Sequence, residues 1–205
     1  VSHIGLSVAG AIGAEEGRVH NSPNITVLNG VMLAEKLEAK LEKPVAIDND
    51  ANCFIRAEML KGAGVKYKDG YGIIVGTGIG GGWWRNDAPH RGEHGNAGEP
   101  GDMVIDFDSG MMLEPAYHKI MQNNPAQVAE EAYRGDPLAQ QTFAELGRYL
   151  GFVLANIINV ADPEVFILGG GVVESSDLFM GEAKKNLRES VKTPGAKKIK
   201  VLRSK

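Results

Sequence analysis

The sequence contains only one cysteine, Cys53, in 205 residues. A single cysteine excludes an intrachain disulfide and a zinc site made of several cysteines, and it is typical of proteins in a reducing compartment. No apolar run approaches the ~20 residues of a membrane-spanning helix. The first residues also lack the basic and apolar regions of a secretion signal. These absences predict a cytoplasmic protein that has no membrane partner.

An excess of positive charge is also missing. Lys and Arg number 22 against 26 Asp and Glu, which gives a formal net charge of −4. Proteins that bind nucleic acid usually show the opposite balance, so we predict no nucleic-acid partner. Aromatic residues make up only 6% of the chain and apolar residues 43%. This composition and length suit one large globular domain or two small ones.

Glycine, by contrast, is abundant: 27 residues, concentrated at positions 62–110 and 169–171. The densest stretch, Gly76-Thr77-Gly78-Ile79-Gly80-Gly81-Gly82, follows an apolar run at 71–75. Glycine lets a backbone approach a ligand closely, and successive free N–H groups bind phosphate. The stretch also suits a tight β-hairpin whose glycines only make the turn. No Lys-Ser or Lys-Thr follows, which excludes a Walker A loop, and the expected strand after it excludes a dinucleotide fingerprint.

Polar residues gather where an expected strand ends. Asp48-Asn49-Asp50-Ala51-Asn52 follows the short apolar strand 45–47 and opens a helix expected over 51–61. In α/β proteins ligand groups commonly lie at this edge of the sheet. A helix N-cap explains one such residue, but four polar residues in five exceed what a cap needs.

Two further loops carry ligand-binding chemistry. Residues 91–102 are dense in glycine, amide and carboxylate groups, which suit a polyhydroxylated ligand or a solvated surface loop. Gly169-Gly170-Gly171 follows the apolar run 163–168. This second glycine turn either borders a nucleotide base or simply reverses the chain.

The remaining pattern predicts alternating strands and helices. Strands are expected at 3–10, 45–47, 71–75, 103–105, 163–168 and 197–203, and helices at 31–42, 51–61, 113–121, 125–134, 137–160 and from about 177. Residues 13–30 are expected to form loops, and 62–69 a linker between domains. Gly147 and Gly151 permit close approach of another helix, in the core or in a dimer.

In order along the chain, these motifs resemble those of the ROK family of bacterial sugar kinases and sugar-responsive repressors. The resemblance rests on Asn49-Asp50-Ala51-Asn52, the stretch 76–82, Arg91-Gly92, Gly95 to Gly101, and Asp162-Pro163-Glu164 leading into Leu168-Gly169-Gly170-Gly171. It implies an α/β, actin-like ATPase (ribonuclease H-like) fold of two lobes, partly truncated here. Residues 1–66 would be the remainder of the small lobe and 67–205 the large lobe.

The implied activity is ATP- and Mg²⁺-dependent phosphorylation of a hexose or N-acetylhexosamine by a homodimeric, glucokinase-like enzyme. Asp50 would be the general base. Asn49, Glu99, Asp102 and Glu114 would bind the sugar. Gly76, Thr77, Gly78, Gly80 and Gly81 would hold the ATP phosphates, and Gly169, Gly170 and Gly171 would border the adenosine.

Three departures from the family pattern qualify this assignment. The family's N-terminal Asp-x-Gly-Gly-Thr phosphate motif does not occur, Asp102 replaces a histidine that contacts sugar and zinc, and the family's Cys-rich zinc loop before Glu114 is missing. We therefore expect no metal site or structural zinc, and weak or no kinase activity from residues 1–205 alone. The alternatives are the sugar-sensing part of a ROK-type transcriptional regulator and a non-catalytic relative.

Overall fold

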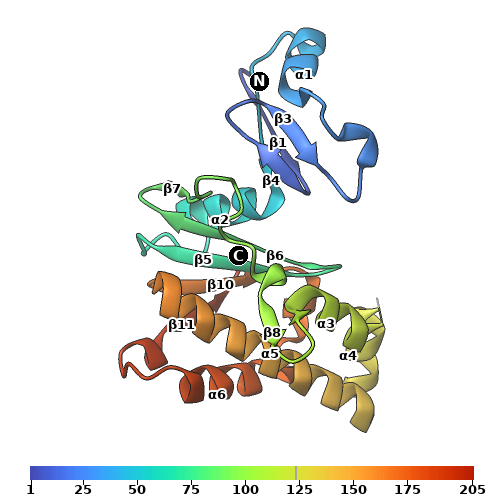
Figure 1. The fold of residues 1–205 in the computed structure, drawn as a ribbon, viewed down its shortest axis with the longest axis vertical. Coiled ribbons are helices and arrows are strands. Elements are labelled where there is room, and N and C mark those ends of the chain that lie inside the picture. The colour runs from blue at the N-terminus through green and yellow to red at the C-terminus, as the bar shows by residue number, and fades with distance from the viewer. Residues whose placement is uncertain (123) are drawn as a thin grey trace.

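A computed structural model describes residues 1–122 and 124–205 as two α/β lobes, one above the other in Figure 1. The small lobe pairs β1 (Ile4–Val8) in parallel with β4 (Val45–Asn49) and β2 (Ala11–Gly13) antiparallel with β3 (Arg18–Asn21). The 3-10 turn η1 (Thr26–Leu28) and helix α1 (Leu33–Leu41) complete it. The prediction of loops over 13–30 was wrong for β3, whose Arg, His and Asn side chains hid the strand among turn residues.

The small lobe has its own hydrophobic core. Apolar residues from the strands and α1 pack together in it: Val8, Val19, Ala34, Val45 and Ile47. Helix α1 ends at Leu41 with Glu42 as its C-cap, whose backbone is left-handed with φ 52°, and Pro44 follows two residues later. The chain then enters β4, which is followed directly by helix α2 (Asp50–Lys61).

The large lobe contains a five-stranded sheet in the order β11-β10-β5-β6-β7. Its central pair, β5 (Gly70–Val75) and β10 (Val165–Gly169), is parallel, and β11 (Lys200–Arg203) extends it in the same direction. Strand β5 turns back through a hairpin into β6 (Ile79–Arg85), which pairs with β7 (Ala88–Pro89). The ends of β5 and β10, each followed by glycines, therefore lie side by side.

Helices cover both faces of this sheet. Tyr71, Ile73 and Val75 alternate along β5 toward the core that contains α5 (Pro137–Ala161) and α6 (Met180–Ser190). On the opposite face, Gly70 and Gly72 admit α2 (Asp50–Lys61), because a Cβ at these positions would strike Met59 or Phe54 and Ile55. The boundary between lobes at residues 66 and 67 stays a prediction, although α2 packs on the large sheet.

The two glycines of α5, Gly147 and Gly151, pack inside the core of the large lobe. A Cβ at Gly147 would lie 2.4 Å from the Phe179 carbonyl oxygen, and one at Gly151 2.7 Å from that of Ala183. Both glycines therefore face the α6 segment and let the two helices pack closely. The 25-residue helix starts where expected, with Asp136 accepting from the Ala139 N–H at 2.8 Å and Pro137 in the first turn.

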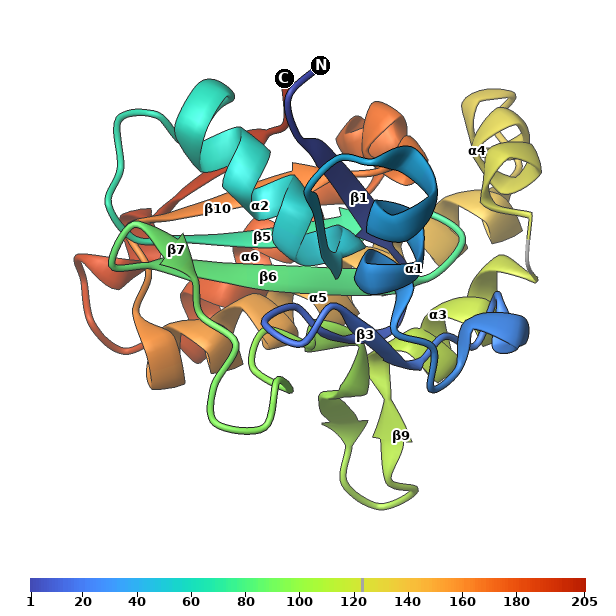
Figure 2. The same cartoon turned by 90° about the horizontal axis from the view of Figure 1, so that it is seen from above.

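The remaining elements are short strands and helices. They are η2 (Pro100–Asp102), β8 (Val104–Asp106), β9 (Met111–Met112), α3 (Leu113–Met121), α4 (Pro125–Tyr133), η3 (Gly171–Leu178) and η4 (Ala196–Lys198). Figure 2 shows the β8–β9 hairpin projecting away from the body of the large lobe. Among the residues that the structure describes, no helix combines the length and apolarity needed to cross a bilayer.

Candidate active site

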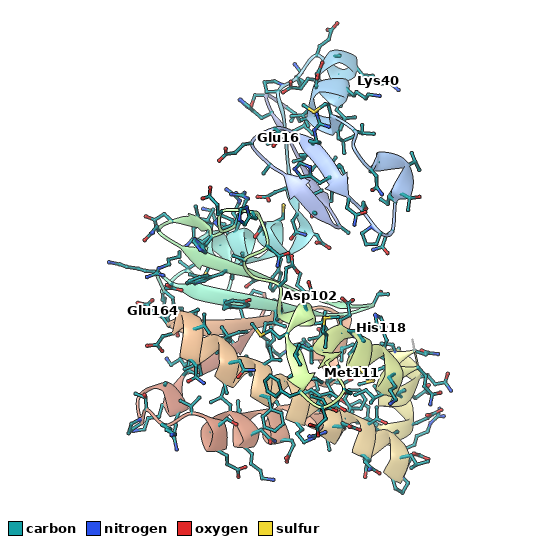
Figure 3. All side chains as sticks on the ribbon, viewed as in Figure 1. Glu16, Lys40, Asp102, Met111, His118 and Glu164 are labelled. Carbon is teal, nitrogen blue, oxygen red and sulfur yellow. The ribbon has the colours of Figure 1, made fainter. Side chains whose placement is uncertain are left out.

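A cavity of about 670 Å³ lies between the two lobes. The small lobe contributes residues around Gly10 and the Pro23–Asn24 loop. The start of α2 also lines the cavity, and the large lobe contributes the glycine turn after β5, the 91–102 loop and α3. Figure 3 shows Asp102 and His118 on the part of the large lobe that faces the small lobe. We call this cavity the cleft.

Asn49 joins the lobes as the N-cap of α2. Its side-chain oxygen accepts from the backbone N–H groups of Ala51 and Asn52 at 2.9 and 3.1 Å. Its amide nitrogen donates to the Gly10 carbonyl oxygen at 3.0 Å. The amide thus caps the helix and ties β4 to the loop after β1. Asn49 is therefore the residue of the polar stretch that acts as the helix N-cap.

The carboxylates on either side of Asn49 differ. Asp48 is only 8% exposed and accepts from Arg91 at 2.5 Å and Arg56 at 3.3 Å, both on Oδ2. Its Oδ1 accepts from Asn52 Nδ2 at 3.4 Å. We call these four side chains the Asp48 bracket. Asp50 is exposed at the first position of α2 and lines the cleft, and its carboxylate accepts from the adjacent Ala51 N–H at 3.0 Å.

The stretch 76–82 is a β-hairpin whose glycines also allow close packing. Among the described residues, its five glycines show no left-handed backbone, so φ is not why they are needed. A Cβ at Gly82 would lie 2.8 Å from the Ala51 carbonyl oxygen, and one at Gly81 2.5 Å from Pro100 Cδ. Strand β6 is therefore held between α2 and the segment that carries Glu99.

The turn itself lies between two cavities. Gly76 and Thr77 line the cleft and also a second cavity of about 320 Å³. That second cavity is otherwise mostly apolar, with Ala126, Phe143, Gly171 and Val172 among its walls. Tyr117 holds the turn by donating its hydroxyl to the Gly76 carbonyl oxygen at 2.5 Å.

The second glycine turn touches the first. Gly170 has φ +92°, and a Cβ there would lie 2.3 Å from the Val75 carbonyl oxygen, so both the backbone and the space require glycine. Gly171 lines the second cavity, whereas Gly169 faces the Phe54 ring on the α2 side of the sheet. The structure thus brings Gly76, Thr77 and Gly171 around one cavity, but not Gly169.

Four carboxylates line the cleft, and we call them the cleft carboxylates: Asp50, Glu99, Asp102 and Glu114. Burial, followed by the negative charges of Asp102, Asp50 and Glu114, raises the pKa of Glu99 to about 7. Glu114 also accepts from the Ile79 N–H of the hairpin at 3.3 Å. Sugar hydroxyls are donors that such carboxylates accept from in fixed directions.

Three residues in or beside the cleft had no role predicted from the sequence. Asp48 and Arg91 form a buried link whose partners are 43 residues apart, so only the folded chain reveals it. His118 lines the cleft, with Nε2 3.5 Å from Glu114 Oε1. Its spacing of four residues from Glu114 in an expected helix was the signal that could have indicated it.

The metal prediction concerns the same region. Across residues 1–122 and 124–205, no group of three or more His, Cys, Asp or Glu side chains is arranged to hold a metal ion. The absence of structural zinc stays a prediction.

The two α/β lobes with a cleft between them have the arrangement of actin-like ATPases. The model of the ROK family matches residues 1–203. The chain therefore belongs to the ROK family, as the sequence motifs predicted.

The relatives of the chain include sugar kinases. The chain is 29% identical over 216 residues to a glucokinase of Halalkalibacterium halodurans, covering 89% of this chain and 65% of the relative. It is 28% identical over 197 residues to an N-acetyl-D-glucosamine kinase of Shigella flexneri, covering 82% of this chain and 65% of that kinase. The chain thus spans somewhat less than two thirds of the length of these relatives.

Solved structures show the same fold. A ROK family glucokinase from Streptomyces griseus, in complex with glucose and AMPPNP, superposes with a TM-score of 0.81 at 26% identity over 100% of this chain and 77% of its own. A ROK family transcriptional regulator superposes with a TM-score of 0.87 at 23% identity over 100% of this chain and 59% of its own. This second likeness concerns the fold alone.

Proposed function

We propose that the protein transfers the γ-phosphoryl group of ATP to a hydroxyl of a hexose or N-acetylhexosamine. The observation that carries this proposal is the cleft itself, where Asp50 and the glycine turn 76–78 line one cavity. The kinase relatives and the glucokinase that holds glucose and AMPPNP support it.

Asp50 is our proposed general base. It has an exposed carboxylate in the cleft and lies outside the Asp48 bracket. In the proposed step the sugar hydroxyl oxygen forms a bond to the γ-phosphorus, its proton passes to the Asp50 carboxylate, and the bond to the β-phosphate oxygen breaks to release ADP. Glu99, Asp102 and Glu114 would accept hydrogen bonds from the other sugar hydroxyls, and Asn49 would hold Asp50 in place by capping α2.

The phosphoryl donor would approach from the second cavity. Its apolar walls suit a nucleotide base, and it meets the cleft at Gly76 and Thr77. Backbone N–H groups of the turn and the Thr77 hydroxyl would bind the phosphates. Mg²⁺, when bound with the nucleotide, would neutralise phosphate charge, and it is usually held by substrate phosphates, water and one or two carboxylates.

The test is a coupled assay of ADP release by the full-length protein with glucose, N-acetylglucosamine and N-acetylmannosamine. We expect at least one sugar to stimulate ADP release, with Asp50→Asn abolishing that stimulation while calorimetry still detects the sugar. Sugar binding without turnover by the native protein would instead support the sugar-sensing alternative. Absence of both binding and turnover would support a non-catalytic relative.

Two attributes remain proposals, a homodimer from the family resemblance and a cytoplasmic location from the single cysteine. Gly147 and Gly151 no longer support the homodimer because they pack against α6 within the chain. Sedimentation of the purified protein tests the first directly.

A further inference from the structure

Charge is unevenly distributed along the chain. Nine of its 22 Lys and Arg residues lie within residues 184–205, where Glu189 is the one acidic residue. The overall net charge of −4 therefore conceals a basic C-terminal region. This region folds as most of α6, η4 and β11, the edge strand of the large sheet. Figure 1 shows α6 on the side of that sheet away from the small lobe.

Five of these cations converge on one hollow in the surface, which we call the basic groove. Its volume is about 260 Å³, and no acidic residue lines it. The cations come from three elements: Lys184 and Arg188 from α6, Lys197 and Lys198 from η4, and Lys200 from β11. Leu187, Ile199, Val201 and Leu202 provide apolar surface between them.

The groove cations lack acidic partners within the described part of the chain. Their neighbours outside the groove are paired, Lys185 with Glu182 at 3.3 Å and Arg203 with Glu174 at 2.8 Å. Lys184 and Arg188 are four residues apart on one helix, a spacing at which like charges destabilise the helix. Lysine on an edge strand discourages pairing with other chains, which explains Lys200 but not the four cations on α6 and η4.

We propose that the basic groove binds a small phosphorylated anion, at a site separate from the cleft. Lys and Arg form strong charge-assisted hydrogen bonds with phosphate oxygens, and several cations around one hollow suit a dianionic group. Ligand pockets usually measure about 300–1,000 Å³, so the groove, at about 260 Å³, lies just below this range and suits a small ligand such as a phosphate or a sugar phosphate. The apolar surface would contact the organic part of such a molecule.

The experiment is an NMR titration of the ¹⁵N-labelled full-length protein in about 150 mM NaCl, which screens weak long-range attraction. Inorganic phosphate, glucose 6-phosphate and glucose are added separately. We expect saturable shifts of the amides at 184–188 and 197–202 with the two phosphates, and none there with glucose. Saturation by glucose 6-phosphate at lower concentration than by inorganic phosphate would identify a sugar phosphate as the ligand, and equal affinity would identify the phosphate group alone.

Matched variants separate a site from general charge. Arg188→Glu with Lys198→Glu reverses two groove cations, and Lys185→Glu with Lys192→Glu makes the same charge change outside the groove. We expect the first pair to weaken phosphate binding by more than about tenfold and the second by less than about twofold. Shifts that never saturate, equal effects of both pairs, or a response to a short oligonucleotide but not to small phosphates would overturn the proposal. The dispersion of each variant's spectrum reports whether it is folded.

Discussion

Two groups of polar side chains each include a carboxylate at the junction of β4 and α2, Asp48 in one and Asp50 in the other, and the groups differ in their partners. The Asp48 bracket joins a buried carboxylate to two guanidinium groups and an amide. The cleft carboxylates form few contacts with the protein and face one another across a cavity. Both oxygens of the buried Asp48 carboxylate have partners, as is typical of polar groups that specify structure, whereas clustered like charges that shift a pKa are typical of functional sites. From this difference we infer that the bracket stabilises the fold and that the cleft carboxylates bind a ligand or take part in the reaction.

The largest expected effect is the loss of activity when Asp50, one of the cleft carboxylates, is replaced. Asp50→Asn keeps the size and the hydrogen bond to the Ala51 N–H but removes the base. We expect kcat to fall by about 10²–10⁴-fold, the usual contribution of general acid–base catalysis. The free energy of unfolding should change by less than about 0.5 kcal/mol. ADP release and urea unfolding measure the two quantities, and a stability loss as large as that of a bracket variant would contradict the distinction.

Breaking the bracket should produce the reverse pattern. Arg91→Met removes one of the two cations that Asp48 contacts and leaves a carboxylate that is 8% exposed with Arg56 alone. We expect a loss of about 2 kcal/mol in the free energy of unfolding, typical of hydrogen bonds to charged groups. Arg134→Met is the control, because its pair with Glu130 is exposed and should cost less than about 0.5 kcal/mol. Equal losses in the two variants would show that the bracket is not structural.

A pair of glycine substitutions tests how the hairpin positions a cleft carboxylate. A Cβ at Gly78 would lie 2.0 Å from Glu114 Oε1, whereas the nearest atom to a Cβ at Gly80 is Ala51 Cβ at 3.8 Å. Gly78→Ala should therefore displace the Glu114 side chain and raise the KM for sugar about tenfold, the effect of ~1.4 kcal/mol. Gly80→Ala should leave KM within about twofold. Steady-state kinetics with the best sugar decide between these outcomes.

The smallest effect concerns pH. The pKa of Glu99 is raised to about 7 in the folded protein, above the ~4.3 of an unperturbed glutamate. Its protonated form is thus favoured by folding, so this contribution to stability is complete below the unfolded pKa and is lost as pH rises through about 7. Glu99→Gln should raise the Tm slightly at pH 8 and leave it unchanged near pH 4.

Activity provides a second readout of the same group. If the Glu99 carboxylate accepts from sugar hydroxyls, the KM for sugar should fall as pH rises from about 6 to about 8, because the ionised form becomes populated. Glu99→Gln should flatten this part of the profile and raise KM. Glu93→Gln, in the exposed part of the same loop, is the control and should leave the profile unchanged.

Much of the fold followed from local pattern. The helix expected over 113–121 and the long helix after Pro137 appear with nearly those bounds, because periodic apolar residues and clear caps mark them. Strand β3 was missed because only Val19 of its four residues is buried. The cleft motifs could be identified in sequence because glycine and carboxylate clusters are compact. The bracket could not, because Asp48 and Arg91 meet only when β4 and the 91–102 loop are brought together.

The wall shared by the two cavities, at Gly76 and Thr77, is formed by one short turn of main chain. A donor and an acceptor seated on its two sides would be separated by a spacing that the sheet sets through the hydrogen-bonded ends of β5. Side chains elsewhere in both cavities could then change during evolution and alter which ligands fit. The distance between a donor and an acceptor on the two sides of the turn would stay the same.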